Sequence, residues 1–282
     1  MILSYHPCFE AHKNLLCAGR EPGIEDLAHI KSANAVILPQ GCSQSLYKMA
    51  RKNCENVFPC FDAKFDYPGK TGQIELFRKT DSRHPETKIF PTVKTFLKQT
   101  EKNRQVLPFD FPFVFKFDWG GEGDTVFLIQ NREILKDVLQ KTEYNERAGW
   151  SGFLIQEYIP SQSRSLRVVV IGESVVSYWR VLKKPGDFCV NLASGGIIDA
   201  DSDPKLQDIA VCHMKKLCNK AKINLAAFDL IFSSDPQKPE PFFLEINYFF
   251  GRKGLGGSEK YYELLVNEIK KWLNLKGIIS ET

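Results

Sequence analysis

The first 85 residues combine short apolar runs with turn-forming residues. Ala35–Leu38 is a short apolar run that leads into Pro39-Gln40-Gly41, which is typical of a buried strand ending in a turn. A helix is predicted before this strand, with apolar residues on one face at Ile24, Leu27 and Ile30. Alternation of strand, turn and helix indicates a small α/β lobe.

The pattern then changes in the middle of the chain. A helix is predicted to open at Lys70-Thr71-Gly72-Gln73 and to run through Phe77, and residues 83–87 resemble a linker. Phe113–Phe117 and Thr125–Ile129 are β-rich runs on either side of a glycine-containing turn, which predicts a hairpin. A helix through residues 134–139 and a strand at 153–156 are expected to follow.

The last part of the chain predicts more strands and two long helices. Valine-rich runs at 166–171 and 174–181 flank Gly172-Glu173, which is typical of a hairpin. Asp203-Pro204 is an expected helix start, with Asp203 as the N-cap. Apolar runs at 225–232 and 242–246 predict two strands, and Ser258 is expected to cap a final amphipathic helix. The chain is therefore predicted to be α+β with an α/β N-terminal lobe, in three parts: residues 1–85, 86–160 and 161–282.

Composition excludes several classes of protein. Of 282 residues, 43% are hydrophobic and 12% aromatic, which is enough for a sizeable core. The net charge of +4 is too mild for a protein that coats nucleic acid, so no nucleic-acid partner is expected. The chain has no run of 18 uncharged apolar residues and no secretory signal pattern, so we expect no membrane partner. Eight cysteines without a CxxC pair are typical of a reducing compartment, which favours the cytoplasm.

The most informative polar residues interrupt the last two predicted strands. Asp229 lies within one apolar run, and Glu245 and Asn247 flank Ile246 in the next. Because strand side chains alternate between faces, Glu245 and Asn247 point the same way, about 6–7 Å apart. If the two strands pair, Asp229 joins them, and three oxygen donors among apolar residues suit a hard cation such as Mg²⁺. The alternative is a set of polar residues at a solvent-facing strand edge.

Lys116 is a second candidate, because a lysine within Phe113–Phe117 needs either an exit to solvent or an anionic partner. Glycines follow within seven residues, at Gly120, Gly121 and Gly123, and glycine backbone can approach phosphate oxygens closely. The loop matches neither a Walker A motif nor a GxGxxG fingerprint. An ordinary half-exposed strand lysine is the competing interpretation.

Three weaker signals follow along the chain. Gln156-Glu157-Tyr158-Ile159 ends a strand where backbone groups could bind the edge of an adenine, although an ordinary strand exit explains these residues as well. Arg167 and Arg180 lie on adjacent predicted strands and suit phosphate or carboxylate recognition, with a surface salt bridge as the alternative. Asn191 precedes a small-residue turn and could place an amide near a phosphate.

Taken in order, these residues resemble the ATP-grasp superfamily. The succession runs from Lys116 and the glycine loop through Gln156–Ile159, the two arginines, Asn-x3-Gly-Gly and Asp229 to Glu245-Ile246-Asn247. It is most similar to the branch of RimK-type glutamate ligases and glutathione synthetases, over roughly residues 64–257. The resemblance implies a small pre-ATP-grasp domain at 1–85, an ATP-grasp small subdomain at 86–160 and a C-terminal subdomain with the metal site at 161–282.

The resemblance also implies roles for the candidate residues. Lys116 and Lys70 would contact the phosphates of ATP, with Gly120–Gly123 as a lid and Arg167 nearby. Glu157 and Ile159 would hold the adenine edge, with Gln156 and Tyr158 beside them. Arg180 and Asn191 would lie near the γ-phosphate as the catalytic pair. The metal ligands would be Asp229, Glu245 and Asn247, binding two Mg²⁺ ions, with Mn²⁺ as an alternative metal.

The implied reaction joins a carboxylate to an amine. A carboxylate oxygen would attack the γ-phosphorus of ATP, and an amine would then attack the acyl phosphate to leave an amide. The partners would be ATP and an amino acid or a peptide or protein acceptor, and an oligomer stays open. A phosphotransferase on the same scaffold and a nucleotide-binding regulatory protein without catalysis are the two alternatives.

The chain departs from the family pattern in three places. Ser165 stands where relatives often carry an aspartate, and no convincing ribose-contacting acid follows Pro160. After Asn247, an aromatic, basic and then glycine-rich loop at 248–257 replaces the usual Pro-Gly turn. Arg252 and Lys253 in this loop are candidates for an anionic substrate group, and a solvated loop is the competing interpretation.

Overall fold

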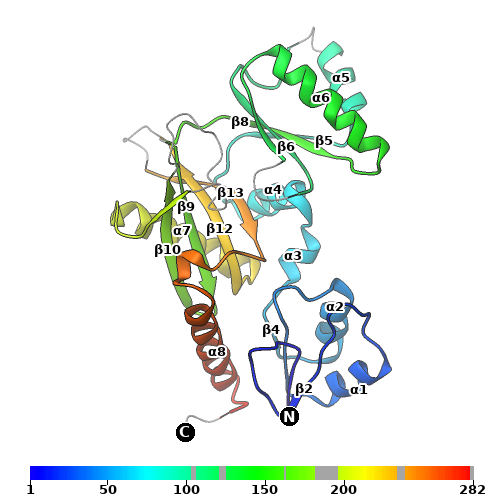
Figure 1. Cartoon of the computed structure of the whole chain (residues 1–282), viewed down its shortest axis with the longest axis vertical. Helices are drawn as coiled ribbons and strands as arrows, with labels where there is room; N and C mark the ends of the chain where they lie inside the picture. The colour runs from blue at the N-terminus through cyan, green and yellow to red at the C-terminus, as the bar shows by residue number, and fades with distance from the viewer. Residues whose placement is uncertain (103–105, 121–124, 162, 182–195, 234–238, 280–282) are drawn as a thin grey trace.

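The computed structural model describes residues 1–102, 106–120, 125–161, 163–181, 196–233 and 239–279. The described residues form three sheets with helices around them (Figure 1). Among these residues, none of the helices combines the length and the apolar character needed to cross a bilayer.

The first sheet is parallel and has the order β2-β1-β3-β4. Its strands are β1 (Ile2–Ser4), β2 (Lys13–Asn14), β3 (Ala35–Ile37) and β4 (Val57–Phe58). Helices α1 (Ile24–Ser32) and α2 (Gln44–Asn53) lie between them in sequence, followed by α3 (Asp62–Asp66) and α4 (Gly69–Lys79). The predicted strand is confirmed as β3, and the two predicted helices are confirmed as α1 and α4. The face assigned to α1 is wrong at Ile24, which is 88% exposed, whereas Ile30 is fully buried and anchors the helix.

The second sheet is antiparallel and has the order β5-β8-β6-β7. Its strands are β5 (Thr87–Phe90), β8 (Phe153–Glu157), β6 (Phe113–Phe117) and β7 (Val126–Ile129). Helices α5 (Val93–Lys102) and α6 (Arg132–Arg147) cover one face, as Figure 1 shows at the top of the molecule. A phenylalanine-rich core fills this interface, with the rings of Phe115 and Phe153 stacked at 4.6 Å. The predicted hairpin is confirmed as β6 and β7.

The third sheet is antiparallel and has the order β11-β10-β9-β12-β13. Its strands are β11 (Ile197–Asp199), β10 (Ser174–Val181), β9 (Arg164–Ile171), β12 (Leu225–Phe232) and β13 (Pro241–Asn247). Helices α7 (Pro204–Ala221) and α8 (Ser258–Leu275) and the short 3₁₀ helix η1 (Lys253–Leu255) complete this part. Its core is continuous with that of the first sheet.

Of the two predicted helix caps, one is confirmed and one is wrong. Asp203 occupies the N-cap position of α7 with Pro204 directly after it, as predicted, although its backbone is left-handed and its carboxylate pairs with Arg164 and makes no capping hydrogen bond. Ser258 is the first residue of α8, and Gly257 occupies the N-cap position. Both helices nevertheless begin where the apolar pattern predicts.

Helix α4 lies at the centre of the molecule. Figure 1 places it between β13 of the third sheet and the sheet that contains β6 and β8. The ring of Phe77 on α4 is 5.5 Å from that of Phe243 on β13, and Phe77 is fully buried. The helix that carries Lys70 is therefore packed against the strand that carries Glu245 and Asn247.

The 3₁₀ helix packs tightly under β10, which gives a testable prediction. A Cβ atom at Gly254 would lie 2.0 Å from Cζ of Tyr178, whose side chain is only 1% exposed. We expect Gly254→Ala to lower the free energy of unfolding by about 1–3 kcal/mol, as overpacking usually does, in a denaturant titration. Gly251→Ala is the matched control, because its added methyl meets no atom within 4 Å. Equal stability of the two variants would contradict this packing.

Candidate functional site

The candidate site is built on a row of residues that crosses three neighbouring strands. Arg167 on β9 pairs in register with Asp229 on β12, and Asp229 pairs with Glu245 on β13. Asn247 lies two residues further along β13, opposite Ala227. Because alternate residues share a face, Asn247 lies on the same face as this row. The structure thus brings the three predicted metal ligands together.

Asp229 is the most enclosed residue of the row, with 7% of its surface exposed. Arg167 binds it through two parallel contacts, from Nε to Oδ1 and from Nη2 to Oδ2, both at 2.8 Å. Arg180 on β10 adds a contact from Nη2 to Oδ1 at 3.0 Å, and Asn247 donates from Nδ2 to Oδ2 at 3.1 Å. These contacts engage the whole carboxylate, since its two oxygens offer about four acceptor positions.

The two arginines determine the ionisation of Asp229. Burial alone would raise the pKa of this carboxyl, but Arg180 and Arg167 outweigh the effect and hold the pKa below its ordinary value. Asp229 is therefore an anion in the folded protein. The interpretation of Asp229 as a solvent-facing edge residue is excluded by its burial.

Glu245 lies in a different electrostatic environment. Burial and the neighbouring Asp229 charge raise its pKa, while Lys70, Lys116 and Arg167 act in the opposite direction. Within the described part of the chain, the Glu245 carboxylate forms no ion pair and accepts no hydrogen bond. A desolvated carboxylate beside another carboxylate is suited to a cation.

Both predicted phosphate-binding lysines lie near this carboxylate. Lys70, at the start of α4, is 8% exposed, and its Nζ donates to the carbonyl oxygens of Gly120 at 2.9 Å and Trp119 at 3.4 Å. Burial lowers the pKa of Lys70, and the charges of Glu245 and Asp118 partly offset this effect. Lys116 on β6 is 9% exposed and helps to stabilise the charged form of Glu245.

Asp118 is a residue of the site that the sequence did not single out. It follows β6 directly, and its Oδ1 accepts a hydrogen bond from the backbone N–H of Thr71 at 2.7 Å. The backbone N–H of Lys70 donates to the carbonyl oxygen of Asp118 at 3.2 Å. Asp118 thus joins the end of β6 to the start of α4. The feature of the sequence that could have indicated Asp118 is its position two residues after Lys116, directly after the same strand.

The end of β8 carries the residues predicted to bind adenine. Gln156 is 1% exposed, and its Nε2 donates to Oγ1 of Thr87 at 2.9 Å, so its side chain stabilises the sheet. Glu157 is exposed, and its Oε2 accepts from the backbone N–H of Glu86 at 3.3 Å. Tyr158 and Ile159 are half-buried.

The loop at 248–257 brings Arg252 against two aromatic rings. Its guanidinium carbon lies 4.8 Å from the ring centroid of Tyr261 and 4.4 Å from that of Tyr262. His6, which follows β1 in the first sheet, packs edge-on against Tyr262 at 6.0 Å. Burial and the nearby Arg252 lower the pKa of His6 to about 4, so this histidine is neutral at physiological pH. Lys253 is exposed.

Some predicted residues cannot be placed. Gly120 adopts a left-handed backbone conformation, with a φ of 80°. Gly121, Gly123 and Asn191 lie outside the described residues. Among the described residues, no three His, Cys, Asp or Glu side chains form a metal-binding group, and the candidate set here uses an asparagine as its third donor.

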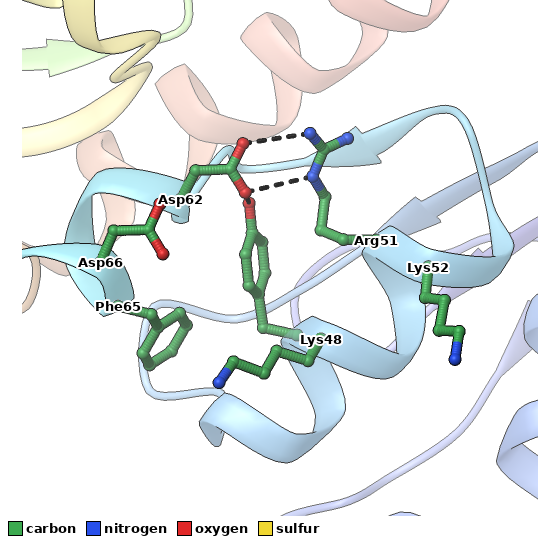
Figure 2. A pocket seen from close by; sticks show the side chains of 7 residues that line it. Lys48, Arg51, Lys52, Asp62, Phe65 and Asp66 are labelled. Carbon is green, nitrogen blue, oxygen red and sulfur yellow. Dashed lines mark hydrogen bonds and ion pairs between the residues drawn. The ribbon is translucent and has the colours of Figure 1, made fainter.

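A pocket of about 300 Å³ lies elsewhere, between α2 and α3 (Figure 2). Arg51 and Asp62 pair across it at 3.0 Å, and the hydroxyl of Tyr47 donates to Asp62 at 2.7 Å. None of the predicted site residues lines it. These charges satisfy one another, so the pocket adds nothing to the candidate site.

Comparison with known proteins places the chain in a family. Residues 70–270 match the RimK-like ATP-grasp domain. A probable alpha-L-glutamate ligase of Xylella fastidiosa is 30% identical over 146 residues, which is 51% of this chain and 44% of that protein. A ribosomal protein bS6–L-glutamate ligase of Salmonella paratyphi B is 29% identical over 151 residues, or 53% and 45% of the two chains. The chain spans about half the length of these curated relatives.

Solved structures show the same fold at low sequence identity. A RimK domain protein ATP-grasp from Sphaerobacter thermophilus has a TM-score of 0.64 and 13% identity, covering 95% of this chain and 98% of that one. An N5-carboxyaminoimidazole ribonucleotide synthetase from Thermotoga maritima has a TM-score of 0.62 and 16% identity, covering 97% and 68%. The predicted α+β ATP-grasp fold is therefore confirmed, and the chain belongs to the RimK-like ATP-grasp family.

Proposed function

We propose that the protein is an ATP- and Mg²⁺-dependent ligase that joins a carboxylate to an amine through an acyl phosphate. The observation that carries the proposal is the row formed by Arg167, Asp229 and Glu245, with Asn247 beside it. Similarity to proteins that are named as glutamate ligases supports a ligase activity.

The donor set fits a magnesium ion. Glu245 supplies a desolvated carboxylate, and Asn247 keeps its carbonyl oxygen for a ligand while its nitrogen donates to Asp229. Hard cations of this kind bind oxygen ligands and usually share them with substrate phosphates. When bound, Mg²⁺ would neutralise phosphate charge and orient the terminal phosphoryl group. Glu245 and Asn247 would hold it first, and Asp229 would join them once its arginine contacts loosen.

Arg180 is the residue whose contacts with Asp229 would loosen. Its link to Asp229 is a single contact at 3.0 Å, whereas Arg167 holds the same carboxylate through two. A triphosphate would offer Arg180 a stronger anionic partner, since guanidinium groups bind phosphate well. Arg167 would remain on Asp229 and keep its geometry. Arg180 would therefore bind the γ-phosphate, and Arg167 would hold Asp229 in place.

The lysines complete the phosphate site. Lys70 and Lys116 both act to lower the pKa of Glu245, which is expected of cations close to this carboxylate. They would stabilise the charge that develops on the transferred phosphoryl group, which is the main catalytic demand in such reactions. The backbone at Gly120 is already tied to Lys70. Gly121 and Gly123, which lie outside the described residues, are proposed to belong to a lid that excludes water from the acyl phosphate, and Asn191, also outside them, is proposed to lie near the γ-phosphate.

The adenine and the acceptor would be bound by residues outside this row. Glu157 and the backbone of Ile159 are proposed to bind the adenine edge, with Tyr158 beside them, while Gln156 supports them through Thr87. Arg252 and Lys253 are proposed to bind an anionic group of the substrate. L-glutamate is the first amine to test, with a peptide or protein carboxylate as the group it joins.

Removing one metal ligand tests the proposed function. We expect Glu245→Gln to lose at least about 99% of Mg²⁺-dependent ATP turnover, because the amide cannot supply the anionic ligand. Turnover is measured with ATP, Mg²⁺ and a panel of amino acids and peptides, following free phosphate and the amide product together. The two products form in step if the enzyme is a ligase, whereas a phosphotransferase would yield a phosphorylated substrate and no amide.

The same variant separates loss of function from loss of fold. The raised pKa of Glu245 means that its charged form opposes folding at neutral pH, since stability is lost as the pH rises through the folded-state pKa. Glu245→Gln should therefore keep or raise the melting temperature at pH 8. Glu240→Gln, at an exposed carboxylate that pairs with Arg83, is the matched control and should retain turnover. Undiminished Mg²⁺-dependent turnover in Glu245→Gln would refute the metal assignment.

A second variant tests the acceptor site. Arg252→Ala combined with Lys253→Ala should raise the KM for the anionic substrate about tenfold and leave the KM for ATP unchanged, because two charges are removed from the acceptor side alone. Lys276→Ala is the control, since this exposed lysine lies beyond the far end of the 18-residue α8. An unchanged substrate KM in the double variant would contradict this assignment.

A further inference from the structure

Gln73 makes an unusual pair of hydrogen bonds with the metal-binding strand. Its Nε2 donates to the carbonyl oxygen of Ile246 at 2.9 Å, and its Oε1 accepts from the backbone N–H of Ile246 at 2.8 Å. Ile246 lies between Glu245 and Asn247, which are two of the three proposed metal ligands. Gln73 is thus bound to the backbone of the residue from which both ligands extend.

The position of β13 explains why such a contact matters. β13 is the last strand of its sheet and pairs on one side only, with β12. A register shift between Asp229 and Leu230 interrupts this pairing. Beyond the shift, only three residues of β13, Glu245 to Asn247, pair with β12. The outer side of an edge strand presents unpaired N–H and C=O groups. The Gln73 amide occupies these groups at Ile246 as a neighbouring strand would.

Glutamine is well suited to this pair of hydrogen bonds. A side-chain amide carries a donor and an acceptor side by side, which matches the N–H and C=O of one strand residue. A carboxylate would lack the donor, and a methionine of similar length would lack both. Gln73 therefore fixes Ile246 from the side opposite β12, and it does so next to the interrupted register.

Gln73 also links this strand to the other half of the site. It lies three residues after Lys70 on α4, so the two side chains share a face of the helix. The start of α4 is in turn bound to Asp118 at the end of β6, the strand that carries Lys116. One helix therefore connects the phosphate-binding lysines with the strand of Glu245 and Asn247 (Figure 1).

On the basis of the proposed function, we propose that Gln73 is a positioning residue that sets Glu245 and Asn247 at the spacing the divalent cation requires. Its amide touches neither the cation nor the nucleotide. It acts through the backbone of Ile246, and its loss removes both hydrogen bonds on the outer side of this residue. The packing of Phe77 against Phe243 keeps α4 attached to β13 when Gln73 is replaced.

Direct cation binding tests this role without knowledge of the substrate. We would titrate Mn²⁺ into the protein with saturating ADP and follow the free ion by electron paramagnetic resonance. Gln73→Met should weaken Mn²⁺ binding about tenfold, as the loss of outer hydrogen bonds commonly does at metal sites. Glu75→Met is the matched control, since Glu75 is an exposed residue of the same helix and the substitution should change binding less than twofold.

The outcomes distinguish the two proposals. If the unaltered protein binds no Mn²⁺ in the presence of ADP, the proposed function itself fails. If the unaltered protein binds Mn²⁺ and Gln73→Met binds it equally well, the role of Gln73 is refuted and the proposed function stands.

Amide hydrogen exchange supplies a measurement that does not depend on a folded variant. In the unaltered protein, the Ile246 amide should exchange slowly although it faces outward from an edge strand, because Gln73 accepts its hydrogen bond. In Gln73→Met its exchange should accelerate at least about tenfold, with no change in Glu75→Met. Rapid exchange of Ile246 in the unaltered protein would overturn the proposal.

Discussion

The site depends on one buried carboxylate held between two arginines. Asp229 lies at the centre of the face formed by β9, β10, β12 and β13, and Arg167 and Arg180 compensate its charge. Removing one partner of such a buried pair typically costs about 3–5 kcal/mol, so the arrangement is a strong constraint on the fold. Lys70 and Lys116 add two further cations near Glu245. Four cationic side chains therefore lie near three carboxylates, those of Asp118, Asp229 and Glu245, and the excess positive charge suits a polyanion such as the triphosphate of ATP.

The arrangement of the three sheets explains how distant residues reach this point. The lysines proposed to bind phosphate come from α4 and β6, whereas the proposed metal ligands come from β12 and β13. α4 contacts both groups through Asp118 at one end and Gln73 in its middle. In the loop at 248–257, Arg252 packs against Tyr262, which in turn contacts His6 next to β1 of the first sheet. The candidate site thus combines residues of the second and third sheets with residues of α4.

Much of the fold could be predicted from the sequence, because long apolar runs and helical spacing mark most of the strands and helices. The shortest strands were missed, such as β2 and β4 with two residues each, since two residues carry no periodicity. α2 was missed as well, where polar residues hide a buried face of Leu46, Tyr47 and Ala50. The N-cap position of Asp203 was predicted correctly, but its side chain makes no capping hydrogen bond because Arg164, 39 residues away in sequence, pairs with its carboxylate.

The three candidate metal ligands could be predicted from the sequence, whereas Asp118 and the contacts between site residues could not. The order of polar residues in apolar strands indicated Asp229, Glu245 and Asn247, and the sheet brings them together. The pairing of Asp229 with Arg167 depends on a strand register that spans 62 positions, and the bond from Gln73 to Ile246 spans 173. No local pattern encodes such contacts. Fold similarity at 13% and 16% identity leaves these side chains as the basis of the functional proposal.

The most direct test of the account is a crystal structure of the protein with ADP and Mn²⁺, recorded with the anomalous signal of manganese. We expect an anomalous peak at coordination distance from the side-chain oxygens of Glu245 and Asn247, next to the phosphates and with Lys70 and Lys116 facing them. A nucleotide bound elsewhere, or a bound nucleotide with no manganese beside Glu245, would contradict it.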